Sequence, residues 1–548
     1  MNDKRDTQQV PDVALSDKGA PGKGGPGNSI GRRHLMKLGA GAVVSALAAP
    51  IASAQQDAGP RGGPPAPGSM RAPGEISPFT GPGYKNDFGR LSGNGPMDDT
   101  TRQIVKWVHD FKDSDVTAAA AHACNRTMVD SISAVIAGFE EPGSRIGASM
   151  ARYSLPSSLK CTVLGYGLTT TPELATFANG CLVREVDFND MSAEGGHVST
   201  LIPAALAMGE ALHSTGTQVM TSIVIGYELA AAPAGGESVI AAMVAGKLMG
   251  LDEERLANAL TIALTPHVAL NKGVGALGMW KGIRSAESAK CGVWAAMLAK
   301  EGMTGPPQPF EGRGGLWSRG GGGGEGGGGR APGEPFTLPV RAGSFAIERN
   351  WFKRRPSEAS SQGILIMMPE VKAWVKPDEI ASIHWDTSYS NWEEICDAPK
   401  WDPRNRDTAD HSLPYIIARA LIDGDVYLDS FTEAKYMDPA ARALMDKTTM
   451  SPVLGWNGNG AGRLTITKKS GETKWFDTYH GDRWLDLKDY VQMSEKEVVD
   501  KYNRVCAYRH VDNAQRDKAY AAWSNLAALK DIGDAMKTMA KFGQPKPL

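Results

Sequence analysis

The chain has 548 residues, of which 41% are hydrophobic and 22% are charged, and this composition is typical of a globular protein with a sizeable core. Its 59 basic and 61 acidic residues give a net charge of -2, which argues against a nucleic-acid-binding protein and against one held on membranes by a basic face. The six cysteines lack CxxC or other metal-type spacing, which excludes a disulfide scaffold and a zinc ribbon.

The N-terminus has the pattern of an export signal. Arg32 and Arg33 precede a short apolar run over residues 38–49, and Ala52-Ser53-Ala54 follows. This order predicts a twin-arginine signal peptide over residues 1–54, an encounter with the twin-arginine translocase and a periplasmic or secreted location. The run is too short for a membrane anchor. Residues 55–97, rich in proline and glycine, are expected to form a disordered linker.

From Asp98 the pattern changes to amphipathic and alanine-rich segments. We expect helices over residues 104–111, 129–139, 174–181, 201–213, 218–231, 239–249, 253–264 and 285–300. Small residues on these segments allow helices to approach closely, which favours a compact all-helical layer. Gly302 is expected to end the last helix, and the glycine-rich residues 312–335 to form an exposed loop.

After Phe345 the pattern includes strands. Residues 381–385 alternate between apolar and polar, and residues 463–467 and 473–477 flank a turn, which predicts a hairpin. Residues 411–422, 494–502 and 514–541 are expected to be helical. We therefore predict a predominantly α, α+β protein, with helical residues 98–345 and 486–548 and an inserted α+β domain over residues 346–485. Substrates usually bind in clefts between domains.

The stretch VREVDFNDMSAEGGHVS brings carboxylates and an imidazole close in sequence. Asp187 ends a helix rich in small residues, and His197 lies just before the next helix. A carboxylate that orients an imidazole is suited to proton abstraction. The competing interpretation is that Asp190 or Ser192 caps a helix and that His197 is an ordinary loop residue.

Two cationic segments favour an anionic ligand. Lys281 and Arg284 lie at the start of an apolar helix, where positive charge opposes the helix dipole, and Lys353 and Arg354 open the second domain. An anion held between the domains would explain both segments, although Arg354 could equally belong to a solvated basic turn. The histidines include no HExxH or paired ligand spacing, so we expect no metal or other cofactor.

Several blocks of the sequence are similar to the MmgE/PrpD family, whose members include 2-methylcitrate dehydratase, cis-aconitate decarboxylase and iminodisuccinate epimerase. They are VREVDFND…GGHVST, VIGYELA, AAMVAGKLMGLDEERL, MWKGIRSAESAKCGVWAAMLAKEGMTGPPQPFEGRGGLW, FKRRPSEASSQ and TADHSLPYIIARALIDGD, and they run through most of the chain beyond residue 97. The resemblance implies a helical domain built from both ends of the chain, an α+β lid, a homodimer and chemistry without a cofactor.

The resemblance also implies a set of site residues. The D-F-D-D motif of the family falls on residues 187–190 and makes Asp187 the active-site acid, while His197, Lys281 and Lys353 take the other catalytic positions. Arg284 and Arg354 would assist in binding the substrate. The family carries a second active-site histidine after the segment aligned with residues 227–228, but here residues 229–237 join almost directly to the next helix, and His267 is the nearest candidate replacement.

The chemistry that the resemblance implies is elimination of water from a small di- or tricarboxylate by a hydro-lyase of the 2-methylcitrate dehydratase type. Cationic side chains would bind the carboxylates and stabilise the charge that develops as a proton leaves. Two alternatives stay open. One is a decarboxylase or epimerase on the same scaffold, and the other is an exported carboxylate-binding protein whose catalysis is impaired by the missing histidine.

Overall fold

The computed structural model describes residues 97–548, apart from residues 156, 194–195, 233–235, 267–274, 276, 313–314, 318–335, 339, 341–342, 457–459, 481–482 and 486–491. The expected signal peptide lies outside the described residues, as do nearly all of the expected linker, His267 and most of the glycine-rich loop. Within the described ranges, none of the helices combines the length and the hydropathy that crossing a membrane requires.

The predicted fold class, predominantly α with a minor β component, is confirmed. The first region contains the helices α3 Asp99–Asp110, α4 Ala118–Gly138, α5 Pro142–Met150, α6 Pro172–Arg184, α7 Ile202–Ala211, α8 Gly216–Ala230, α9 Glu237–Leu248, α10 Glu253–Leu264 and α11 Trp280–Lys300. A short hairpin of β1 Cys161–Val163 and β2 Leu168–Thr170 lies between α5 and α6.

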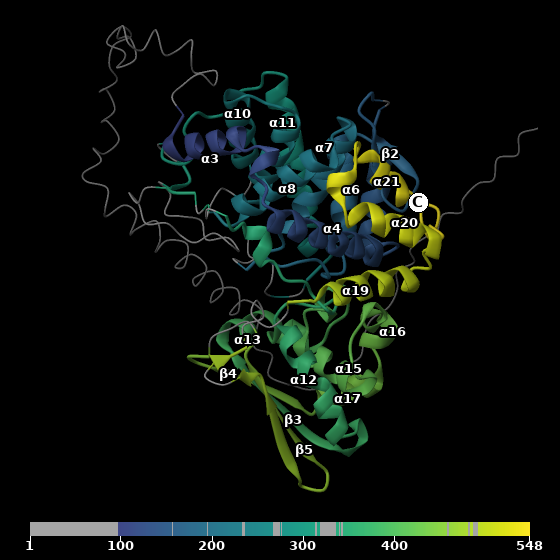
Figure 1. Ribbon diagram of the computed structural model, residues 1–548. Helices are drawn as coiled ribbons and strands as arrows, with labels where there is room; N and C mark the ends of the chain where they lie inside the picture. Colours follow the sequence, from purple (N-terminus) through teal and green to yellow (C-terminus); the bar gives the residue numbers. More distant parts are fainter. Residues whose placement is uncertain are drawn as a thin grey trace, which may run out of the picture. The chain divides into compact units, whose positions relative to one another are not determined.

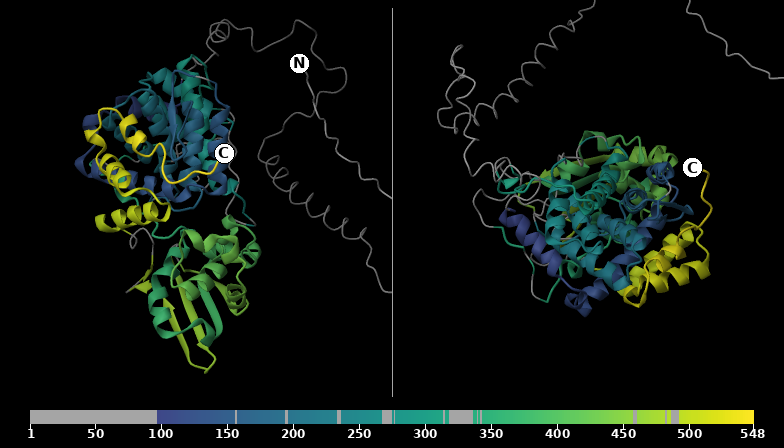
Figure 2. Two further views of the ribbon diagram at one scale, coloured as in Figure 1. Left: turned by 90° about the vertical axis from the view of Figure 1, so that its right-hand side faces the viewer. Right: turned by 90° about the horizontal axis from the view of Figure 1, so that it is seen from above.

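The last three helices return to this helical region. They are α19 Glu495–Tyr508, α20 Asn513–Trp523 and α21 Gly533–Thr538. Helices α19 and α20 pack against α4, and α21 packs against α7, so that both ends of the described chain contribute to one helical layer (Figures 1 and 2). This arrangement brings α19 beside segments that are several hundred residues earlier in the sequence.

Small residues allow the helices around the site to pack closely. A Cβ atom added to Gly292 of α11 would collide with the carbonyl oxygen of Ser238 in α9, and one added to Gly180 of α6 would lie 2.7 Å from the Cβ atom of Ala286 in α11. Side chains larger than hydrogen would therefore separate α11 from its two neighbours. Gly180 thus allows α6 and α11 to pack closely, and these two helices carry site residues at their ends.

The α+β region follows in the sequence and is drawn mainly in green in Figure 1. Its elements are α12 Ser361–Trp374, β3 Ile380–Ser388, α13 Tyr389–Ile395, α14 Arg406–Ala409, α15 Leu413–Asp423, α16 Glu433–Tyr436, α17 Pro439–Met445, β4 Thr448–Val453, β5 Gly462–Lys468 and β6 Thr473–Asp477. A further short pair consists of β7 Tyr479–His480 and β8 Arg483–Trp484.

The main sheet of this region has the strand order β4-β3-β5-β6. Strand β3 pairs in parallel with β4 and antiparallel with β5, where Trp385 lies opposite Leu464. The predicted hairpin is confirmed, because β5 and β6 pair antiparallel and Gly471 adopts a positive φ of 89° in the connecting turn.

Two separate groups of apolar side chains form the cores of these regions. The larger group includes Ile132 of α4, Val244 of α9 and Tyr502 of α19. The smaller one includes Trp385 of β3 and Ile416 of α15. Each region therefore buries its own apolar surface, which is the usual behaviour of a separate structural domain.

One expected helix is wrong in its extent. Residues 514–541 do not form a continuous helix, because α20 ends at Trp523 and Asn525 leaves the helical conformation with φ -146° and ψ 66°. The carbonyl oxygen of Leu529 instead accepts a hydrogen bond of 2.9 Å from the peptide N–H of Gly216, at the start of α8. This tertiary contact replaces the next helical turn.

Candidate active site

Asp187 is the centre of the site and has an unusual backbone conformation. Helix α6 ends at Arg184, and Asp187 follows with φ at +48°, in the left-handed region. Aspartate adopts this region more easily than most residues, yet such conformations cost about 1–3 kcal/mol and persist where the surroundings enforce them. The turn directs a carboxylate that is 5% exposed into a cluster of charged side chains.

Three cationic side chains surround the Asp187 carboxylate. Arg184 Nη1 lies 2.6 Å from Oδ1, Lys353 Nζ lies 2.7 Å from Oδ2, and Lys281 Nζ lies 4.0 Å from Oδ2. Burial by itself would raise the pKa of Asp187, but the charges of Lys281, Lys353 and Arg184 together hold the pKa well below its usual value. The carboxylate therefore stays ionised across the physiological pH range.

His197 contacts the same carboxylate. The peptide N–H of Ser192 donates to the carbonyl oxygen of Gly196. His197 follows and is the N-cap residue of a short 3-10 helix, Val198–Leu201. Its Nε2 atom lies 3.3 Å from Oδ1 of Asp187, and its Nδ1 atom lies 2.9 Å from the carbonyl oxygen of Asp190. A carbonyl oxygen only accepts hydrogen bonds, so Nδ1 carries a proton.

The imidazole of His197 is neutral in this setting. Burial and the positive charges of Arg184 and Lys353 lower the pKa of His197 well below its ordinary value, against the opposing effect of Asp187. With the proton on Nδ1, the lone pair of Nε2 is available and faces Asp187. A proton that arrived at Nε2 would form an ion pair with that carboxylate.

Asp190 has a supporting position rather than a reactive one. Its Oδ1 atom accepts from the peptide N–H of Ser199 at 3.1 Å, and its Oδ2 atom accepts from the Tyr227 hydroxyl at 2.6 Å and from the Asn350 amide at 3.0 Å. Asp190 is not the N-cap of the following 3-10 helix, because His197 has that position, but its carboxylate accepts a hydrogen bond from the first turn of that helix. His197 is bound into the charged cluster and is not an ordinary loop residue.

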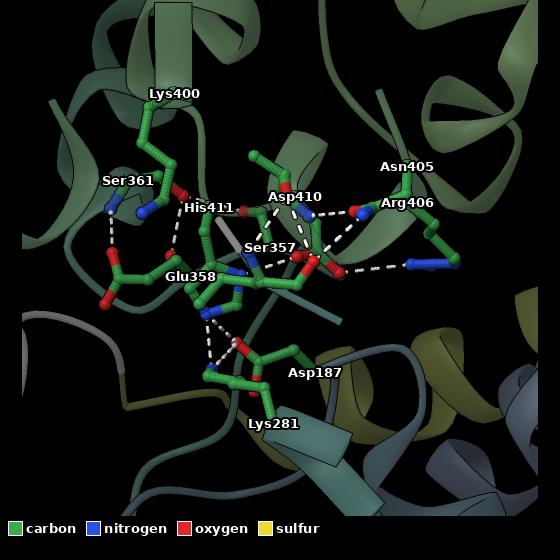
Figure 3. A network of polar contacts seen from close by, with 12 residues as sticks. Asp187, Lys281, Ser357, Glu358, Ser361, Lys400, Asn405, Arg406, Asp410 and His411 are labelled. Carbon is green, nitrogen blue, oxygen red and sulfur yellow. Dashed lines mark hydrogen bonds and ion pairs between the residues drawn. The ribbon is translucent and has the colours of Figure 1, made fainter. Parts of the chain in front are cut away.

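A second imidazole reaches the cluster from the α+β region. His411 precedes α15, is 2% exposed, and its Nε2 atom accepts a hydrogen bond from the Lys281 ammonium. The same Nε2 atom lies 3.9 Å from Oδ2 of Asp187. Figure 3 shows Lys281, Asp187 and His411 directed toward one another, although they come from three different segments.

His411 is itself part of a series of hydrogen bonds that continues to Asp410 and Arg406. Its Nδ1 atom donates to Oδ1 of Asp410 at 2.5 Å, and Arg406 Nη1 donates to Oδ2 of Asp410 at 3.1 Å (Figure 3). Burial, together with the charge of Lys281, lowers the pKa of His411 well below its ordinary value. Burial also raises the pKa of Asp410 to about 7. His411 is thus held neutral, with its acceptor nitrogen on the ammonium of Lys281.

Only part of the cluster is accessible. Lys353 is fully buried and Arg184 is 2% exposed, whereas the Lys281 and His197 side chains are 13% and 17% exposed. A ligand would therefore contact Lys281 and His197 directly. Arg184 and Lys353 would act through their charge from behind Asp187.

The structure brings together all four residues that the sequence predicts as catalytic, Asp187, His197, Lys281 and Lys353. The two predicted substrate-binding arginines have other neighbours: Arg284 lies 3.7 Å from Glu237, and Arg354 donates to Glu497 of α19 at 2.7 Å. Neither arginine has a described contact with Asp187.

Arg184, His411 and Asp410 are members of the cluster that sequence reasoning did not single out. Asp410 and His411 lie within the block TADHSLPYIIARALIDGD that carries the resemblance, and that block was the available signal. Arg184 precedes Asp187 by three residues, which is ion-pair spacing on a helix, but a basic residue in the last helical turn also has an ordinary explanation in the helix dipole.

The cluster suits an anion better than a cation, because a metal ion would face Arg184, Lys281 and Lys353. Among the residues that the structure describes, the group whose ligand atoms lie close enough to share a metal is His109, Asp110 and Glu253, on α3 and α10. This group is largely exposed, and Lys106 already pairs with Asp110 at 2.6 Å. It contributes nothing to the Asp187 cluster.

Comparisons with known proteins find two family models that match this chain. A model of the MmgE/PrpD N-terminal domain matches residues 102–324, and a model of the MmgE/PrpD C-terminal domain matches residues 356–525. All the residues of the cluster except Lys353 fall within these ranges.

Relatives with assigned activities are lyases, at low identity. A cis-aconitate decarboxylase-like protein of Aspergillus oryzae is 26% identical over 39% of this chain and 50% of its own length. The mitochondrial 2-methylcitrate dehydratase of Yarrowia lipolytica is 24% identical over 64% of this chain and 71% of its own. The cis-aconitate decarboxylase of Homo sapiens is 23% identical over 64% of this chain and 76% of its own.

Proposed function

Because the chain belongs to the MmgE/PrpD family, we propose that it is a lyase that acts on a small di- or tricarboxylate without a cofactor. The observation that carries this proposal is the pairing of a single ionised carboxylate, Asp187, with three cationic groups and two neutral imidazoles. Such a cluster can bind an anion, accept a proton and stabilise new negative charge, which are the three tasks of an elimination next to a carboxylate.

Binding rests on the excess of positive charge. Arg184, Lys281 and Lys353 together outweigh Asp187, so the accessible side of the cluster attracts an anion. Lys281 is the cation that a substrate carboxylate would touch, because Lys353 and Arg184 are shielded from solvent. The buried cations keep their effect on the substrate because few water molecules screen them.

Proton abstraction falls to His197 in this proposal. Its Nδ1–H is held by the Asp190 carbonyl, which fixes the ring and leaves Nε2 as the acceptor. Removal of a proton from the carbon beside a substrate carboxylate converts His197 to an imidazolium, and Asp187 at 3.3 Å stabilises that charge. The negative charge that remains on the substrate would be stabilised by Lys281.

The leaving hydroxide needs a proton, and the Lys281 ammonium is the accessible donor. His411 accepts a hydrogen bond from Lys281 and is itself fixed by Asp410, so the lysine is held in one orientation. In this scheme His411 supplies the second imidazole that the family resemblance calls for, and it comes from a different part of the chain. Water then leaves, and an alkene with its carboxylates intact remains.

Decarboxylation is the second candidate, because two of the three relatives described above carry the names of cis-aconitate decarboxylases or of proteins like them. Loss of carbon dioxide also leaves negative charge on carbon, which the same cations would stabilise before a proton is returned. The two reactions differ in their products and not in the type of site that they require.

A product assay separates these possibilities. The purified chain would be given 2-methylcitrate, citrate, malate and cis-aconitate in turn, with proton NMR and a carbon dioxide assay as readouts. A new alkene without carbon dioxide supports dehydration, and stoichiometric carbon dioxide supports decarboxylation. Ligand-induced thermal stabilisation without any product would refute the lyase proposal and favour a carboxylate-binding protein.

A further inference from the structure

Lys501 of α19 is a buried lysine that the proposed reaction does not use. Its side chain is 3% exposed, and its ammonium donates to Oδ1 of Asp130 at 2.6 Å, to the carbonyl oxygen of Phe188 at 2.7 Å and to the carbonyl oxygen of Lys353 at 3.0 Å. These three acceptors match the three ammonium protons. The nitrogen also lies 3.9 Å from the centre of the Phe188 ring.

Two of these acceptors belong to the backbone of the site. Phe188 directly follows Asp187, whose left-handed conformation needs support from its surroundings. The other carbonyl belongs to Lys353, whose own ammonium pairs with Asp187 at 2.7 Å. Lys501 therefore holds the main chain on both sides of the Asp187–Lys353 ion pair.

The same face of α19 makes a second contact with the segment that carries Lys353. Glu497, one helical turn before Lys501, accepts from Arg354 at 2.7 Å, and Arg354 directly follows Lys353. Asp130 of α4 is fully buried and balances the charge of Lys501. A buried ammonium is costly unless it is paired and hydrogen-bonded, so this arrangement specifies one geometry for the segments that it joins.

We propose that Lys501 is a positioning residue that keeps Asp187 and Lys353 in register for the reaction. The proposal rests on the function proposed above for its kinetic consequence, but its geometric content does not. Without the ammonium, Phe188 and Lys353 lose a shared donor, and the ion pair between Lys353 and Asp187 loosens. The positive field on His197 then weakens.

The test compares Lys501→Met with Lys496→Met in the full chain. Lys496 lies on the same helix, is 83% exposed and pairs with Asp500, so its substitution controls for effects on the helix itself. For Lys501→Met we expect folded protein whose kcat falls about 100-fold, as for other small misplacements of catalytic groups, while KM changes much less. Lys496→Met should keep the kcat of the unsubstituted protein.

A second readout does not need turnover. The ring protons of His197 can be titrated by NMR, and Lys501→Met should move the pKa of His197 upward toward an ordinary imidazole, because Lys353 is less firmly held beside it. A lower melting temperature with unchanged kcat and an unchanged His197 titration would overturn the proposal. If the unsubstituted chain turns over none of the carboxylates, the proposed function fails, whereas the titration still decides the role of Lys501.

If Lys501→Met does not fold, Lys501→Gln serves for the same measurements, because its amide still donates two hydrogen bonds but carries no charge. We then expect a decrease in kcat of less than about 100-fold and an upward shift of the pKa of His197 relative to the unsubstituted chain. Values equal to those of the unsubstituted chain would contradict the proposal.

Discussion

The ammonium of Lys353 lies 2.7 Å from Oδ2 of Asp187, and both side chains are shielded from solvent. A buried pair of this kind is expensive to desolvate, and its removal on one side leaves an uncompensated charge. Lys353 therefore acts on a ligand through the state of Asp187 and His197 rather than by contact. The accessible groups, Lys281 and His197, are the ones whose substitution has the most direct effects on binding and turnover.

Lys281→Ala should weaken binding of a carboxylate ligand. The side chain is the accessible cation of the cluster, and a hydrogen bond to a charged group is typically worth about 1.5–3 kcal/mol, so the Kd should rise about 10- to 100-fold. Isothermal titration calorimetry measures this directly. Lys290→Ala, on the same helix and paired with Glu287, is the matched control, and equal affinities of the two variants would remove Lys281 from the site.

His411→Leu should lower kcat more than His411→Gln. The leucine cannot accept a hydrogen bond from Lys281, whereas the glutamine amide oxygen can, so only the second variant keeps the lysine oriented. Steady-state kinetics on both variants checks the order. Equal kcat values for the two variants would show that the hydrogen bond to Lys281 is not what His411 contributes.

The value of kcat/KM should stay constant down to a lower pH than it would if the base were a histidine with an ordinary pKa. The pKa of His197 is lowered by burial and by Arg184 and Lys353, so the base stays deprotonated as the pH falls through about 6.5, the usual value for histidine. The acidic limb should appear below that value. A limb centred at or above it would contradict the assignment of the neutral imidazole of His197 as the base.

Glu185→Gln should change the pH dependence of stability. Burial raises the pKa of Glu185 to about 7, so this group contributes stability that is fully present below its unfolded pKa of about 4.3 and is lost as the pH rises through about 7. A glutamine at this position does not titrate, so Glu185→Gln does not lose stability in this way as the pH rises. Relative to the unsubstituted chain, the melting temperature of the variant should be lowest at about pH 4 and should rise steadily as the pH increases to about 8.

A matched control for this prediction is Glu254→Gln, which substitutes an exposed glutamate of α10. Its melting temperature relative to the unsubstituted chain should not change with pH in the same way. If the unsubstituted chain instead gains stability over Glu185→Gln as the pH rises, the sign of the Glu185 effect is wrong.

The sequence predicted much of the helical region because its patterns are local. Helix α10 matches its expected range, and the hairpin of β5 and β6 has its glycine in the turn. Helix α5 has no counterpart among the expected elements, because its buried face consists of the small residues Gly143, Ser144, Gly147 and Ala148, which are weakly hydrophobic. Strand β4 pairs in parallel with β3, and such pairing between distant segments leaves no local signal.

For the site too, residues in recognisable sequence motifs were predicted, whereas residues that act through distant contacts were not. Asp187, His197, Lys281 and Lys353 were predicted from motifs that resemble a family, and the charged cluster of the structure contains all four residues. His411 and Lys501 were missed, because a histidine before a capped helix and a lysine on an amphipathic helix both have ordinary explanations. Their roles depend on contacts with residues more than one hundred positions away.

In the proposed reaction, His197 removes a proton from a carboxylate substrate that Lys281 holds. The most direct test measures turnover and ligand binding side by side for the unsubstituted chain and for His197→Asn, with the carboxylate that gives a product in the NMR assay. If His197 is the base, kcat of His197→Asn should fall about 10²- to 10⁴-fold while the Kd changes by less than about threefold. Full activity of His197→Asn would contradict this role of His197.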